Sequence, residues 1–74
     1  MIELVDDMVK YKTLGDRLKF LRGKEKQKFY ANLLGVTPET YCKYEKNIID
    51  LGWKRLKRIA EHNGLSLDML LLGL

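Results

Sequence analysis

The sequence contains a single cysteine, Cys42, and a single proline, Pro38, among its 74 residues. One cysteine cannot form a disulfide within the chain, which fits a reducing compartment such as the cytosol. No apolar run reaches the roughly 18 residues that a membrane-spanning helix needs, and no signal-peptide pattern begins the chain. We therefore expect a cytoplasmic protein that has no membrane partner.

Residues suited to catalysis or metal binding are also scarce. His62 is the only histidine, and its place near a predicted helix end favours a surface role. Cys42 is expected to be a half-buried structural thiol. The sequence has no His and Cys at metal-ligand spacing, no Gly-rich phosphate loop and no nucleophile elbow. We therefore expect no enzyme activity, metal, cofactor or small-molecule substrate.

Acidic residues are few in the middle of the chain. Residues 10–58 hold all 14 Lys and Arg against five acids, a net charge of +9. Residues 1–9 carry −3 and residues 59–74 carry −2. A basic centre between acidic ends suggests a polyanion partner, although charge alone fits a solvated surface equally well.

No segment shows the alternation of a β-strand, whereas five segments after residue 12 carry apolar residues at helical spacing. Gly23, Gly35 and Gly64 are expected to end three of these helices, and Asn47 a fourth. The sequence thus predicts an all-α fold, with residues 13–74 as one domain and residues 1–12 as an arm or short extra helix. The expected helices cover residues 14–22, 26–34, 38–46, 53–63 and 67–74.

The expected helix after Gly35 has strong start signals but no wide apolar stripe. Thr37 can cap it, Pro38 suits its first position, and Glu39 lies at the positive end of its dipole. A very short Gly-containing turn joins it to the preceding helix, as in a helix-turn-helix unit. In that unit the second helix presents its N-terminal residues to the DNA major groove. The polar outer face is therefore interpreted as a surface for base edges.

The segment WKRLKRIAEHNG is the clearest amphipathic helix in the sequence. Its apolar residues are expected to face the core, and its basic run is more often a solvated face than a DNA clamp. The inward set is Trp53, Leu56, Ile59 and Ala60, and the outward set is Lys54, Arg55, Lys57 and Arg58.

Taken together, these segments resemble the Cro/repressor-type (lambda-repressor-like) helix-turn-helix family of bacterial and phage transcriptional regulators. The likeness covers roughly residues 14–72 and rests on the order and spacing of LGDRLKFLR, QKFYANLLGVTPETYCKYEKN and LKRIAEHNGLSLDMLL. It implies a compact five-helix DNA-binding domain. It also implies a sequence-specific repressor or phage-type switch that binds a double-stranded operator as a homodimer.

The resemblance also implies roles for individual residues. Arg22 and Glu45 match a family pair that joins the first and third helices, and Ala31 would be the small residue that lets them cross closely. Glu39 could accept from cytosine, Thr40 could touch a thymine methyl or a phosphate, and Lys43 could donate to guanine. The base-contacting set is Pro38, Glu39, Thr40 and Lys43. The phosphate-contacting set is Gln27, Lys26, Lys28, Thr37, Lys46 and Asn47, with Lys24 nearby.

Some features depart from the family pattern. The link from Arg22 to Gln27 is about two residues short, and Lys26 stands where a capping residue is usual. An alternative function is a protein-interaction module on the same fold, such as an antitoxin or an assembly-recruiting domain. The surface that binds the partner would then consist of Phe29, the acidic ends of the chain and the Leu cluster at the C-terminus. For a dimer, the candidate surfaces are LLLGL at the C-terminus and Ile2, Val5, Met8 and Val9 near the N-terminus.

Overall fold

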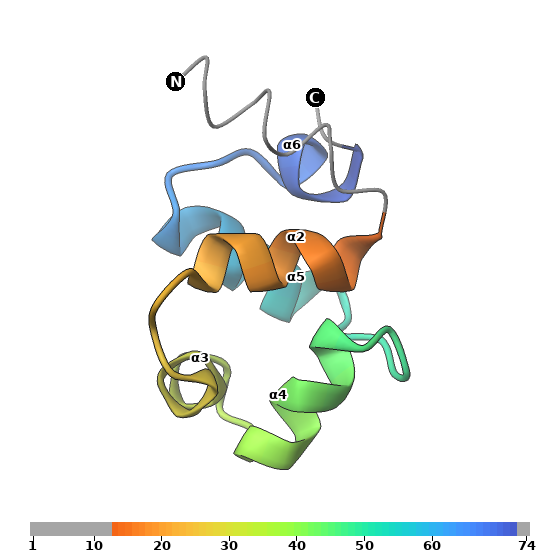
Figure 1. Ribbon diagram of the computed structural model, residues 1–74. Coiled ribbons are helices and arrows are strands. Elements are labelled where there is room, and N and C mark those ends of the chain that lie inside the picture. The colour runs from red at the N-terminus through yellow and green to blue at the C-terminus, as the bar shows by residue number, and fades with distance from the viewer. Residues whose placement is uncertain (1–12, 73–74) are drawn as a thin grey trace.

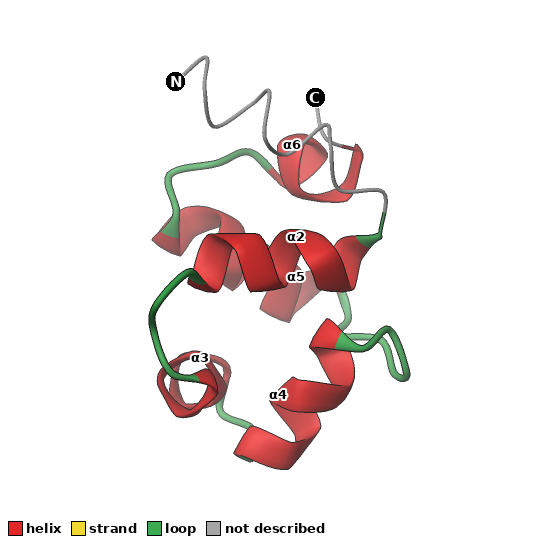
Figure 2. Cartoon of the chain, viewed as in Figure 1, coloured by secondary structure: helices red, strands yellow, loops and turns green. Residues whose placement is uncertain are grey.

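The computed structural model describes residues 13–72, which fold into five helices without a strand (Figure 2). The predicted all-α class is therefore confirmed for this part of the chain. The expected arm or helix over residues 1–12 and the N-terminal dimer surface lie outside the described residues. The helices are α2 (Leu14–Arg22), α3 (Gln27–Leu34), α4 (Pro38–Glu45), α5 (Trp53–His62) and α6 (Leu67–Leu72).

Side-chain caps start three of the helices. The hydroxyl of Thr13 accepts a hydrogen bond from the Asp16 amide at 3.2 Å, and that of Thr37 accepts from the Thr40 amide at 3.2 Å. The Ser66 hydroxyl caps α6 in the same way. Each cap satisfies a backbone donor that has no partner within its own helix. The predicted caps at Thr37 and Ser66 are confirmed.

Left-handed residues end α3 and α4. Gly35 has φ 71° and Asn47 has φ 60°, a conformation that non-glycine residues other than Asn and Asp seldom adopt. Beyond Asn47, the Ile48 amide donates to the Lys43 carbonyl at 3.0 Å and closes a Schellman turn. The prediction that Asn47 ends this helix is confirmed.

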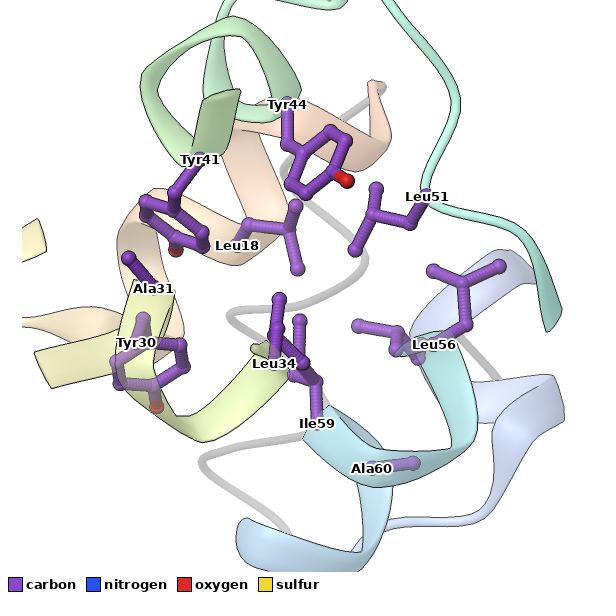
Figure 3. Packing of buried hydrophobic residues seen from close by; sticks show 11 residues of the cluster. Leu18, Tyr30, Ala31, Leu34, Tyr41, Tyr44, Leu51, Leu56, Ile59 and Ala60 are labelled. Atoms are coloured by element: carbon purple, nitrogen blue, oxygen red, sulfur yellow. The ribbon is translucent and has the colours of Figure 1, made fainter. Parts of the chain in front are cut away.

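The five helices pack around one core. In Figure 1, α2 crosses the middle of the molecule in front of α5, with α6 on one side of it and α3 and α4 on the other. Figure 3 shows the tyrosines of α4 pointing at Leu18 of α2, with Leu34 and Ile59 close by. Tyrosines thus provide the buried face of α4, which lacks a stripe of aliphatic residues. The buried apolar residues are Leu18, Tyr30, Ala31, Leu34, Tyr41, Tyr44, Leu51, Leu56, Ile59, Ala60 and Leu70.

The prediction for Trp53 is wrong. Its side chain is 62% exposed, whereas the neighbouring Leu51 is only 3% exposed and joins the core. Side chains on a helix point back toward its N-terminus, so the indole of the first residue of α5 projects beyond the helix end. Leu56, Ile59 and Ala60 face inward as predicted.

Arg17 joins α2 to the C-terminal helix. Its side chain is buried, and its Nη1 donates to the carbonyl oxygens of Leu70, at 3.2 Å, and Leu71. A cation at the end of a helix is stabilised by the helix dipole and satisfies carbonyls that lack partners. Leu70 is fully buried, so only Leu71 of the predicted Leu cluster is exposed within the described side chains. None of the described helices is long and apolar enough to span a membrane.

Candidate nucleic-acid interface

Helix α4 has one buried face and one exposed face. Tyr41, Tyr44 and Glu45 are buried against the rest of the domain. The short link of Gly35, Val36 and Thr37 carries the chain from α3 into α4. Of the predicted base-contacting residues, Pro38, Glu39 and Lys43 are exposed and Thr40 is half-buried.

A salt bridge anchors the C-terminal end of α4 to α2. Nε of Arg22 lies 2.6 Å from Oε2 of Glu45, and Nη2 lies 3.1 Å from Oε1, so the pair is bidentate. The side chains are only 16% and 5% exposed, respectively. The structure thus brings together the two residues that the resemblance pairs. Since Glu45 is held inside, its charge does not oppose a polyanion at the outer face of α4.

The second partner of Glu45 is Gln27, whose Nε2 donates to Oε1 at 3.1 Å. Burial alone would raise the pKa of Glu45, but the hydrogen bonds from Arg22 and Gln27 outweigh it and hold this pKa below its ordinary value. The hydrogen bond to Glu45 likewise raises the pKa of Arg22. Both groups are therefore charged in the folded protein at neutral pH.

The Tyr41 ring lies next to the Arg22–Glu45 ion pair, on the side of the core. Its residue is fully buried, and its hydroxyl lies close to the Glu45 carboxylate without reaching the geometry of a full hydrogen bond. Burial raises the pKa of Tyr41, and the negative charge of Glu45 raises it further. The phenol therefore stays neutral and acts as a large core side chain.

Gly15 allows a close approach between α2 and the end of α4. A Cβ atom placed on Gly15 would lie 2.3 Å from the Glu45 carbonyl oxygen, well inside van der Waals contact. The Gly15 amide also donates to Oδ1 of Asn47 at 2.9 Å, and Nδ2 of Asn47 donates to the Thr13 hydroxyl at 3.2 Å. Gly15 is therefore a point of close backbone approach between these two helices, and Ala31, for which that role was predicted, is buried on α3.

The predicted phosphate-contacting residues divide into two groups. Lys26, Lys28 and Lys46 are exposed, as is the nearby Lys24. The other three already serve structural contacts. Gln27 bonds Glu45, the Thr37 hydroxyl caps α4, and the Asn47 amide bonds α2. The phosphate contacts of both groups stay predictions.

Three structural roles were not predicted from the sequence. Gly15 stood inside a helical pattern, where an isolated glycine often marks close packing, and this was the available signal. The contacts of Arg17 with Leu70 and of the Asn47 amide with Gly15 gave no signal, because these partners lie 53 and 32 residues away in the sequence. Cys42 is half-buried, as expected.

Comparison with known proteins adds no relative. No protein-family model matches the chain, and no curated protein or solved structure is significantly similar to it. Within residues 13–72, no group of three or more His, Cys, Asp or Glu side chains could hold a metal ion.

Proposed function

We propose that this protein is a sequence-specific DNA-binding transcriptional regulator, of the repressor or phage-switch kind, that reads the major groove with α4. The observation that carries the proposal is the two-faced build of α4. Its inner face is fixed by the Arg22–Glu45 salt bridge and two buried tyrosines, while its N-terminal turn is exposed. A rigid helix with a free polar N-terminal turn is what base readout requires.

Each exposed side chain of α4 has chemistry that suits a base edge. A carboxylate at Glu39 can accept from the amino group of cytosine, and Lys43 can donate to O6 and N7 of guanine. The Thr40 methyl can contact the methyl group of thymine. Pro38 lies at the first position of α4. It would approach the bases next to those that the other three side chains contact.

The surrounding lysines would supply affinity rather than specificity. On α4 and its end, Lys43 and Lys46 oppose Glu39, so the exposed net charge there is only about +1. Lys24, Lys26 and Lys28 add positive charge at the start of α3. Phosphate contacts release counterions, and so we expect binding to weaken steeply as salt rises.

Two copies of the domain would bind one operator. Two-fold dimers of helix-turn-helix proteins place their recognition helices in successive major grooves, about 34 Å apart along the duplex. An inverted repeat with half-sites about one helical turn apart is therefore the expected operator.

The decisive experiment is selection from a random duplex library at about physiological salt, where non-specific contacts are weakened. An inverted-repeat motif is the expected outcome, and it would also give the half-site spacing. Recovery of no motif, with weak binding that disappears as salt rises, would contradict the proposal.

A substitution on α4 then tests whether α4 is the recognition helix. Lys43→Ala removes the predicted guanine donor, and we expect it to relax selection at one base pair of each half-site, a loss of about 1–3 kcal/mol. Lys57→Ala is the matched control, because Lys57 is also an exposed lysine but lies on α5. Unchanged selection by Lys43→Ala would show that α4 is not the recognition helix.

A further inference from the structure

The outer face of α3 carries an exposed aromatic anchor. Phe29 is 43% exposed, and Leu33 lies four residues later, on the same side of the helix, half-buried. The Phe29 ring is held edge-on against Tyr30 at 5.8 Å and beside His62 at 5.6 Å. These two contacts favour one orientation of the ring before any partner arrives, which lowers the entropic cost of binding.

Phe29 and Leu33 together form an apolar strip along α3. Two surface depressions lie beside this strip. The first is lined by Phe29 and Asn32 together with Lys24, Lys26 and Lys28. The second lies between α3 and α5 and also includes Asn32, so the two depressions adjoin. We call the two together the α3 surface. Its second half is lined chiefly by Asn32, Leu33, Lys54, Arg55 and Arg58.

Both arginines of this surface are positioned by backbone carbonyls. Nε of Arg58 donates to the Leu33 carbonyl at 3.0 Å, and Nη1 of Arg55 donates to the Leu51 carbonyl at 3.3 Å. Each guanidinium has five N–H donors and these bonds use one, so donors are left over for a carboxylate. The α3 surface holds six Lys and Arg against one acid, Glu25.

We infer that the α3 surface docks an acidic, amphipathic segment of a partner protein. Apolar side chains of that segment would pack on Phe29 and Leu33, while its carboxylates would bond the lysines and arginines on either side. The charge complementarity selects an acidic ligand, and the apolar strip selects a polypeptide over duplex DNA. A phosphate backbone offers charge but no apolar side chain to cover Phe29. None of these residues belongs to the proposed base-contacting set on α4. Lys24, Lys26 and Lys28 are also the lysines proposed to lie near DNA phosphates, so the peptide and DNA would compete for them.

The test is a titration of the isotope-labelled protein with a short synthetic peptide of Leu, Phe, Asp and Glu, followed by backbone NMR. We expect saturable shifts centred on Phe29, Asn32, Leu33 and Arg58. The same peptide with Asn and Gln in place of its acids should bind at least about tenfold more weakly. Absence of shifts at millimolar peptide, or shifts centred on α4, would overturn the inference.

Matched variants then separate docking from non-specific charge attraction. Lys54 and Lys57 are both exposed lysines on α5, but Lys57 lines neither depression. We expect Lys54→Gln to weaken peptide binding about threefold and Lys57→Gln to leave it nearly unchanged. Phe29→Ala should weaken it about tenfold or more. Equal losses from the two lysine variants would overturn the inference.

Other occupants would show themselves in the same spectra. If removing residues 1–9, which carry −3, shifts the α3-surface resonances, then this chain covers its own surface and the inference is wrong. If these resonances shift with protein concentration alone, the occupant is a second copy and the inference is also wrong. Because Lys43→Ala leaves the α3 surface intact, its DNA and peptide affinities test the two proposals separately.

Discussion

Two contacts between helices show opposite chemistry. The contact of α2 with α4, which we call the polar seam, contains Gly15, Arg22, Glu45 and Asn47. The contact of α3 with α5, which we call the apolar seam, contains Tyr30, Leu34, Ile59 and Ala60 (Figure 3). The first adds directional bonds and a glycine to the packing of the α4 tyrosines on Leu18, and the second depends chiefly on filled volume.

The difference assigns a separate task to each seam. Apolar packing tolerates exchanges of similar volume and contributes stability in proportion to the area it buries. A bidentate salt bridge and a backbone contact tolerate only one arrangement of the two helices. The polar seam therefore sets the orientation of α4, whose outer face is the proposed reading surface, while the apolar seam provides much of the stability.

The largest expected effect comes from breaking the polar seam at its charge. Glu45→Ala leaves Nε and Nη2 of Arg22 and the Gln27 amide without their acceptor in a poorly hydrated place, while Nη1 of Arg22 keeps the Glu25 carbonyl. Removing one partner of a buried pair costs about 3–5 kcal/mol, and we expect about 3 because Arg22 retains some exposure. Urea denaturation measures this loss. A loss below about 1 kcal/mol would show that the pair is a surface salt bridge of little consequence.

A methyl group at Gly15 is expected to have the next largest effect. In an ordinary helix, Gly→Ala stabilises by up to about 1 kcal/mol. In Gly15→Ala the new Cβ meets the Glu45 carbonyl at 2.3 Å, so α2 and α4 must separate. We expect a net loss of about 2 kcal/mol in urea denaturation. Lys19→Ala, an exposed change on the same helix, should shift stability by only a few tenths of a kcal/mol.

The apolar seam should respond more mildly to a small deletion. Ile59→Val removes one methylene from a fully buried side chain, and we expect a loss of about 1 kcal/mol with the fold retained. The matched control is Ile48→Val, because Ile48 is 62% exposed and the same deletion there should cost almost nothing. Equal losses at both positions would show that Ile59 is not in the core.

The smallest expected effect concerns pH. The folded-state pKa of Glu45 lies below its ordinary value of 4.5, so the unfolded chain takes up a proton first as the pH falls. The stability from the ion pair is therefore complete above about pH 4.5 and is lost as the pH falls through the folded-state pKa. The stability gap between the wild type and Glu45→Gln should narrow on acidification. A gap that stays constant between pH 7 and pH 3 would contradict the ion-pair assignment.

The local features of the fold were predictable from the sequence. Caps at Thr37 and Ser66, the ends at Gly35 and Asn47, and the outward basic run of α5 all depend on neighbours within a few residues. Trp53 was misplaced because helical periodicity gives the direction of a side chain but does not show whether the core extends as far as the first turn of the helix. The indole extends past the first turn of α5, where Leu51 already fills the core.

The candidate site was predictable only in part. The chain pattern indicated that α4 would be short, capped and polar outside, and it placed Glu39 and Lys43 where they are exposed. It could not show that Gln27 would turn toward Glu45, or that both ends of the Asn47 amide would bond to α2. Such contacts depend on the distance between helices, which no sequence spacing specifies.

The sequence by itself determined the helices, their caps and the excess of positive charge, because backbone conformation and charge follow from local residue types. Only the tertiary structure decided which charges are buried inside the protein and which are exposed to a partner. Glu45 and Arg22 neutralise each other between two helices, so α4 presents Lys43 and Lys46 against Glu39 alone. Burial makes that distinction, since a charge outside the protein is hydrated and a charge inside must find a partner.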